Sequence, residues 1–155
     1  YRGAAIFHRL EGCFHGDDSV YFNATHGGDA NAGQVWRFQP DGDDGGELTL
    51  VFESPSRDVL DSPDNLCVSP RGGLVICEDG ADDQFVRGLT PEGDVVDLVR
   101  APETEGQPGP TEFAGSCFSP DGNVLFFNQQ GSRSRDGTVA GSTFALFGDW
   151  SRGGV

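Results

Sequence analysis

Short apolar runs separated by glycine, proline and acidic residues fill the chain, and they recur with a regular period. Three segments, residues 13–22, 67–76 and 117–126, align without gaps and begin with a cysteine at about 50-residue spacing. Each has a short apolar strand, a turn built from Asp, Gly or Pro, and a second apolar strand. This pattern predicts three β-hairpins.

The period continues beyond each of the first two hairpins. Gln34–Gln39 is followed by a turn and a strand at Leu48–Phe52, and Gln84–Leu89 is followed by a turn and a strand at Val95–Val99. A third hairpin is followed by one more strand near Thr143–Phe147. Four strands in a unit of about 50 residues are typical of a propeller blade. The sequence therefore predicts an all-β fold, a β-propeller of four-stranded antiparallel blades.

The blades are expected at about 12–54, 66–101 and 117–150, so that 1–155 forms one partial propeller domain. A closed ring needs at least about four blades. The expectation is that an N-terminal half of the parent protein is missing and is needed to complete the ring.

The chain has 25 acidic residues against 10 cations, all of them Arg, and a formal net charge of −15. Such a surface repels nucleic acid, so no nucleic-acid partner is expected. No apolar run approaches the roughly 18 residues of a membrane helix, and no membrane partner is expected either. The excess of carboxylates has two readings, solubility or cation binding, and composition alone does not choose between them.

Polar residues cluster at one end of the three predicted hairpins, because the residue before a first strand and the residue after a second strand share that end. The candidates are Arg9, Glu11, Asp64, Asn65, Glu78, Asp79 and Glu112. Converging carboxylates repel one another unless a proton or cation intervenes. A metal site for Ca²⁺, Mg²⁺, Mn²⁺ or ferric iron is therefore expected near the propeller axis.

Arg9 precedes Glu11 by two residues, so both side chains point to the same side of an extended segment. Its guanidinium could hold an oxyanion such as phosphate with two hydrogen bonds. Each candidate also has a plain structural alternative: Asp64 and Asn65 could cap a turn, Glu112 could pair with an arginine, and Glu78 with Asp79 could form an Asx turn. The three histidines show no ligand spacing and are read as structural or surface residues.

The cysteines are interpreted as structural. Cys13, Cys67 and Cys117 share one repeat position, where a small buried residue suits an inner strand. Cys77 lies on the strand returning from Cys67, which leaves a strained cross-strand disulfide as an alternative. No metal-binding cysteine spacing is present.

Several motifs, taken in order, resemble the C-terminal part of the PhoX family of alkaline phosphatases, from about Phe7 to Trp150. The segments that carry the resemblance are Arg9-Leu-Glu-Gly12, Gly33-Gln-Val-Trp-Arg37, Ser62-Pro-Asp-Asn-Leu66, Ile76-Cys-Glu-Asp79, Thr111-Glu-Phe-Ala-Gly115 and Cys117-Phe-Ser-Pro-Asp-Gly122. The resemblance implies a propeller enzyme that hydrolyses phosphomonoesters with Ca²⁺ and Fe³⁺ and is exported, folded, by the twin-arginine route to the periplasm or outside the cell.

Within that resemblance, Glu11 is similar to a family metal ligand and Arg9 to a phosphate-binding arginine, and both are candidate catalytic residues. Asp64, Glu78, Asp79 and Glu112 fall in motifs that approach the metals. The family's metal-binding cysteine belongs to an N-terminal half, so the repeat cysteines do not inherit that role. Two alternatives remain: a gluconolactonase-like metal lactonase, which has no need of Arg9, and a non-catalytic Ca²⁺-binding scaffold propeller.

Overall fold

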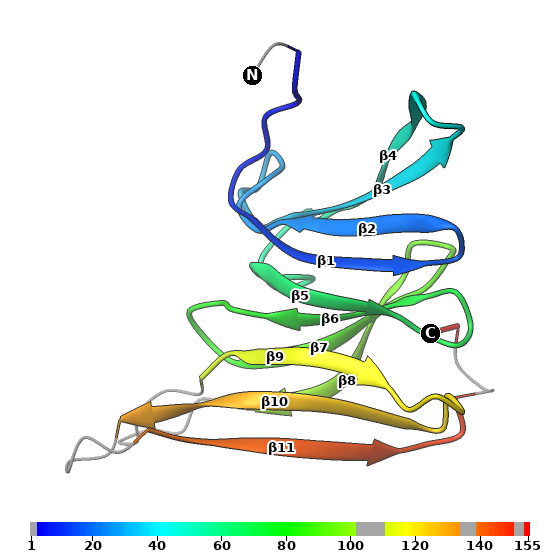
Figure 1. Cartoon of the computed structure of the whole chain (residues 1–155). Coiled ribbons are helices and arrows are strands. Elements are labelled where there is room, and N and C mark those ends of the chain that lie inside the picture. Colours follow the sequence, from blue (N-terminus) through cyan, green and yellow to red (C-terminus); the bar gives the residue numbers. More distant parts are fainter. Residues whose placement is uncertain (1–2, 102–110, 134–138, 151–153) are drawn as a thin grey trace.

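The computed structural model describes residues 3–101, 111–133, 139–150 and 154–155 of the chain. Eleven strands and no helix lie in these residues, and they form three antiparallel sheets (Figure 1). The predicted all-β propeller architecture is confirmed, with two four-stranded sheets and a third of three described strands. No helix in these ranges could cross a membrane.

The first sheet has the strand order β1-β2-β3-β4. Its strands are β1 (Leu10–Gly16), β2 (Ser19–Ala24), β3 (Gln34–Asp41) and β4 (Gly45–Glu53). Asp17 and Asp18 both have positive φ, 49° and 54°, in the two-residue turn that joins β1 to β2. Tight hairpins require this left-handed backbone, and Asp accepts it more readily than most residues.

The second sheet has the order β5-β6-β7-β8, and the third has the order β11-β10-β9. The second contains β5 (Pro63–Val68), β6 (Leu74–Glu78), β7 (Gln84–Leu89) and β8 (Val95–Ala101). The third contains β9 (Phe113–Phe118), β10 (Val124–Arg133) and β11 (Val139–Phe147). Each hairpin predicted from the repeat is thus one strand pair at the start of a sheet.

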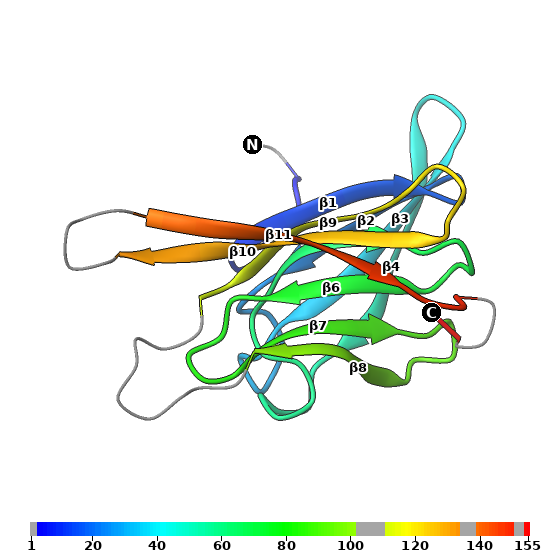
Figure 2. The same cartoon turned by 90° about the horizontal axis from the view of Figure 1, so that it is seen from below.

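The sheets stack face to face, with the first strands β1, β5 and β9 beside one another (Figures 1 and 2). Tyr21 and Val35 of the first sheet pack on Leu66 and Ile76 of the second. On the opposite face of the second sheet, Cys67, Val75, Cys77 and Val86 pack on Phe113, Leu125 and Phe127 of the third. Packing on both faces of the second sheet explains why its strands β6 and β7 are buried along almost their whole length.

The cysteines correct one prediction. Cys67 and Cys77 are buried, but Cys13 and Cys117 are exposed, and all four are free thiols. Cys13 pairs with Phe22 and Cys117 with Phe126, whereas Cys67 pairs with Val75, one residue short of the matching partner. The second hairpin is out of register with the other two by one residue, so the shared sequence position is not a shared structural position. Burial raises the pKa of Cys67 to about 11 and that of Cys77 to about 12.

A β-bulge interrupts the first strand of each sheet near the same end. The irregularities lie between Leu10 and Cys13, between Pro63 and Asn65, and opposite Phe126 and Asn128, where β9 has one additional residue. In β5 the additional residue is Asp64. Bulges change the direction of a side chain and occur frequently beside active sites.

Candidate active site

Three backbone hydrogen bonds close the same end of the three hairpins. Thr25 N donates to Arg9 O at 2.8 Å, Asp79 N to Ser62 O at 3.0 Å, and Gln130 N to Glu112 O at 3.0 Å. Each bond joins the segment before a sheet's first strand to the segment after its second strand. The candidate polar residues are therefore held on ordered backbone at the end of each hairpin.

Asp64, Asp79 and Glu112 form an acidic cluster at this end. Each offers a carboxylate oxygen, and these oxygens lie within 4.8 Å of one another. Asp64 comes from the bulge of β5, Asp79 directly follows β6, and Glu112 directly precedes β9. All three are half-buried. Segments from two sheets thus bring three carboxylates to one point.

The cluster is electrostatically unfavourable when all its carboxyls are ionised. Burial raises the pKa of Asp64, and the charges of Glu11 and Asp79 raise it further. Burial also raises the pKa of Glu112, followed by the effect of Asp79. Arg9 opposes both shifts only partly. A proton or a cation would relieve this repulsion.

Arg9 lies beside the cluster and joins it to the first sheet. Its Nη2 donates to Asp79 Oδ2 at 2.8 Å and its Nε donates to Glu11 Oε1 at 3.0 Å. These two hydrogen bonds raise the pKa of Arg9, the bond to Asp79 having the larger effect. The Arg9 side chain is 38% exposed, so its guanidinium is accessible to a small anion.

Glu11 borders the cluster but is not part of it. Its carboxylate is bonded to Arg9, and its charge contributes to the raised pKa of Asp64. Gly12, the next residue, explains how closely β1 and β5 approach. A Cβ atom at Gly12 would stand 2.6 Å from Asp64 O and 2.9 Å from Leu66 N, so only glycine fits.

The structure does not bring Glu78 or Asn65 into the cluster. Glu78 is 1% exposed, accepts hydrogen bonds from Asp61 N and Arg87 Nε at 2.9 Å each, and lies away from Asp79 because neighbouring residues point to opposite faces. Asn65 Oδ1 accepts a hydrogen bond from Ser116 N at 3.0 Å. The geometry thus gives Glu78 an ion pair and Asn65 a link between β5 and β9, in place of the expected position among the acidic ligands.

One histidine without any ligand spacing in the sequence lies beside Arg9 at the edge of the site. His26 Nε2 lies 3.3 Å from Arg9 Nη1. His26 follows Thr25, whose backbone is bonded to Arg9, and this position at the end of the first hairpin was the available signal. His26 is therefore connected to the site through Arg9.

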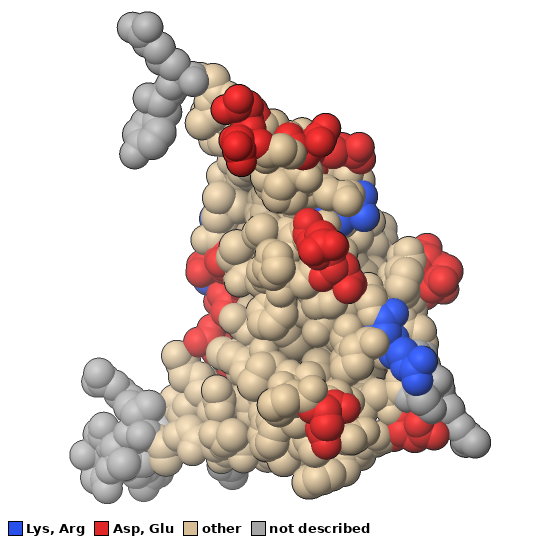
Figure 3. Space-filling view, turned by 45° about the vertical axis from the view of Figure 1, so that its right-hand side comes forward, with Lys and Arg blue, Asp and Glu red and all other residues tan. Residues whose placement is uncertain are grey.

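The cluster fits a hard cation. Carboxylate oxygens are the ligands that Ca²⁺ and similar ions prefer, and Ca²⁺ takes about six to eight oxygen ligands. Asp64, Asp79 and Glu112 supply three or more of these. Burial, and after it the neighbouring carboxylate charges, raise the pKa of Asp64 and that of Glu112, and a cation would neutralise those charges. Figure 3 shows further patches of acidic side chains on one face of the molecule.

Two solved structures are similar to this chain. A putative gluconolactonase has 18% sequence identity and a TM-score of 0.53, over 89% of this chain and 49% of that one. A streptogramin B lyase has 22% identity and a TM-score of 0.48, over 85% of this chain and 39% of that one. The chain thus spans less than half the length of either protein, and the likeness concerns the fold alone.

A comparison with curated proteins finds no match. The family model of alkaline phosphatase PhoX, in contrast, matches residues 1–132. That range contains Arg9, Glu11 and all three residues of the acidic cluster. The resemblance seen in the ordered motifs is therefore confirmed, and the chain belongs to the PhoX family of alkaline phosphatases.

Proposed function

We propose that this chain supplies part of the active site of a metal-dependent alkaline phosphatase that hydrolyses phosphomonoesters. The observation that carries the proposal is the meeting of Asp64, Asp79 and Glu112 beside Arg9. Family membership supports phosphatase chemistry. Neither the lactonase nor the scaffold alternative has an observation of its own in its favour, because the gluconolactonase likeness concerns the fold only.

In the proposed site, the acidic cluster holds Ca²⁺ through carboxylate oxygens, with Glu11 available at its edge. When bound, the metal ions of the family withdraw charge from phosphate oxygens and stabilise the attacking and leaving oxygens. Ferric iron, which the family resemblance implies, requires ligands beyond these three. Asn65 and Glu78 are left out of the proposed ligand set because their oxygens already accept other hydrogen bonds.

Arg9 orients the phosphate group. Its planar guanidinium can give two parallel hydrogen bonds to phosphate oxygens, which also favours the charge that develops in the transition state. In the structure Nη2 and Nε are bonded to Asp79 and Glu11. Cation binding by Asp79 would weaken its hold on Arg9 and so make donors available to the substrate.

The proposed enzyme needs more blades than the three sheets of this chain. The three sheets form an open stack, and a propeller ring generally closes with four or more blades. We propose that an N-terminal half of the parent protein supplies the remaining blades and further metal ligands. Export by the twin-arginine route to the periplasm or beyond is part of the same proposal, and fractionation of the source cells would test it.

The function is tested on the protein purified from its source. The wild type should release phosphate from p-nitrophenyl phosphate when Ca²⁺ is present, lose activity in EGTA, and regain it when Ca²⁺ is restored. Asp64→Asn should lower kcat/KM by at least about 100-fold, because a lost charge in the cluster weakens transition-state stabilisation. Asp44→Asn, in an exposed turn far along the first sheet, is the matched control.

Lactone hydrolysis is measured in the same preparations. Turnover of a lactone without release of phosphate would favour the lactonase. Absence of any hydrolysis, with a melting temperature that rises on addition of Ca²⁺, would favour the scaffold. Either result would overturn the phosphatase proposal.

A further inference from the structure

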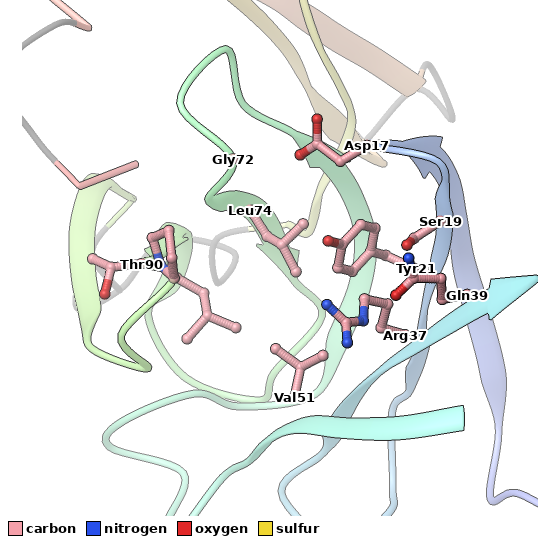
Figure 4. A pocket seen from close by; sticks show the side chains of 11 residues that line it. Asp17, Ser19, Tyr21, Arg37, Gln39, Val51, Gly72, Leu74 and Thr90 are labelled. Atoms are coloured by element: carbon pink, nitrogen blue, oxygen red, sulfur yellow. The ribbon is translucent and has the colours of Figure 1, made fainter. Parts of the chain in front are cut away.

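A cavity of about 330 Å³ lies between the first and second sheets (Figure 4). Its walls include the β1–β2 turn at Asp17 and the turns after β5 and β7 at Gly72 and Thr90. These turns are at the opposite end of the sheets from the acidic cluster. The cavity is thus separate from the candidate active site, and its volume lies at the small end of the range of ligand pockets.

Arg37 of β3 points its guanidinium into this cavity (Figure 4). Arg9, Arg57, Arg87 and Arg100 each have a carboxylate partner. The side chain of Arg37 has neither an ion pair nor a hydrogen bond among the described residues, and its Nε is buried without a partner. The chain has 25 acidic residues and 10 arginines, so carboxylates outnumber arginines. An arginine side chain without a carboxylate partner in such a chain points to an anion from outside the chain.

The other walls divide into polar and apolar parts. Ser19, Tyr21 and Thr90 line the cavity and each carries a hydroxyl, of which that of Thr90 accepts a hydrogen bond from Asp94 N. Tyr21 is the direct cross-strand partner of Arg37, so that its ring lies beside the guanidinium. The only acidic lining residue, Asp17, points away from Arg37 in Figure 4 and forms no ion pair with it.

The apolar part of the wall comes from Val51, Leu74 and Leu89. Leu74 and Leu89 are almost completely buried and belong to the core between the sheets, which makes this wall rigid. A ligand that satisfies both parts has a negatively charged head and a small apolar body. An arginine partly withdrawn from water binds such a head more strongly than an exposed one does, since solvent screening is weaker there.

We propose that this cavity binds a small organic oxyanion, a carboxylate or a phosphate-type group, with its charged head on Arg37 and its apolar body against Leu74 and Leu89. The proposal does not depend on the phosphatase assignment. Arg37 and Arg9 lie at opposite ends of the first sheet, and the two sites share no residue.

The test uses benzoate, phenylphosphonate and inorganic phosphate as anionic probes and benzylamine as the cationic control. Calorimetric titration of the protein purified from its source should show binding of benzoate or phenylphosphonate and none of benzylamine. Arg37→Gln should weaken that binding about tenfold or more, because a charge-assisted pair of hydrogen bonds is lost. Arg9→Gln should leave the benzoate affinity unchanged, which separates this site from the phosphatase site.

A second variant keeps the test valid if Arg37→Gln unfolds. Val51 lies at the surface, 36% exposed, so Val51→Trp can fill the cavity mouth while Arg37 stays in place. Binding that survives both variants, or the absence of benzoate and phenylphosphonate binding at ~10 mM, would overturn the proposal. Binding of inorganic phosphate alone would show a simple phosphate site without the apolar contact, and would overturn the organic part. In crystals soaked with 4-bromobenzoate, an anomalous bromine peak beside Leu89 is expected.

Discussion

The guanidinium of Arg9 bonds to the carboxylate of Asp79 at 2.8 Å, across 70 positions of sequence and between two sheets. Because Arg9 also holds Glu11, one side chain connects the first blade to the acidic cluster. The cluster and the proposed phosphate-binding group are thus adjacent before any ligand is bound.

Arg9→Gln removes this connection and the proposed phosphate contact. We expect kcat/KM for p-nitrophenyl phosphate to fall about 100-fold, as for loss of one transition-state donor. The unfolding free energy should change by less than about 1 kcal/mol, since the ion pairs of Arg9 are solvent-accessible. Arg100→Gln, which removes an ion pair with Asp83 outside the site, should leave kcat/KM intact. Equal effects of the two substitutions would contradict the role given to Arg9.

Ca²⁺ affinity should depend on pH through the acidic cluster. The pKa values of Asp64 and Glu112 are raised, chiefly by burial, so protons compete with the cation at higher pH than they would at isolated carboxyls. The metal binds the ionised form, and the apparent affinity should therefore decline as the pH falls. Titrations with Ca²⁺ between about pH 8 and pH 5 measure this.

Glu112→Gln is the companion variant for that series. It removes one of the two titrating carboxyls, so its Ca²⁺ affinity should be lower at pH 8 and should vary less with pH. An unchanged pH dependence in this variant would exclude Glu112 from the cation site.

Gly12→Ala tests the close approach of the first two blades. Its Cβ would press on backbone atoms of Asp64 and Leu66, at 2.6 and 2.9 Å, so β1 and β5 must separate. We expect a loss of about 1–3 kcal/mol in unfolding free energy, typical of overpacking, together with weaker Ca²⁺ binding because Asp64 is displaced. Gly45→Ala, where the nearest atom is 3.9 Å away, is the control and should change neither chemical denaturation nor calcium titration.

The buried pair of Glu78 and Arg87 is expected to be structural. Arg87→Met leaves Glu78 without its cation in a buried position, and should cost about 3–5 kcal/mol of unfolding free energy. Glu78→Gln should cost less, and the double variant should cost less than the two single changes together. Urea denaturation of the four proteins gives the coupling, and additive effects would argue against a direct pair.

The same pair predicts a pH effect on stability. Burial outweighs the attraction of Arg87 and raises the pKa of Glu78 to about 7, from 4.5 for an unfolded chain. The folded state therefore binds this proton more tightly than the unfolded state. The resulting stabilisation is full below about pH 4.5 and is lost as the pH rises through about 7. The stability of the wild type relative to Glu78→Gln should decline across that window, as measured by thermal melts; a constant difference would refute it.

The sequence revealed most of the fold because the repeat is written in apolar alternation and turn residues, which are local signals. The rule that hairpin ends coincide also found Arg9, Asp64, Asp79 and Glu112. It did not separate Asp79 from Glu78, because strand alternation shows that the side chains of two neighbours point to opposite faces but not which of them joins the acidic cluster. That choice depends on how one sheet packs against the next.

The register of strand pairing was the second feature that the sequence did not predict. A gapless alignment places Cys67 with Cys13 and Cys117, but the second hairpin pairs Cys67 with a partner one residue nearer in sequence, so it takes a different position in the ladder. The role of Asn65 was hidden for a related reason: its partner, the backbone of Ser116, is 51 residues away, and no local pattern encodes that hydrogen bond.

The bulge at Asp64 has a consequence for how such a site can change over time. The inserted residue in β5 bears a proposed metal ligand without occupying a place in the hydrogen-bonded ladder, so Pro63 and Asn65 keep their partners whatever stands between them. Substitutions at position 64 are thereby uncoupled from sheet pairing. Related proteins could therefore carry a different residue at position 64, and lose or change the proposed metal ligand, while keeping the same pairing in the blade.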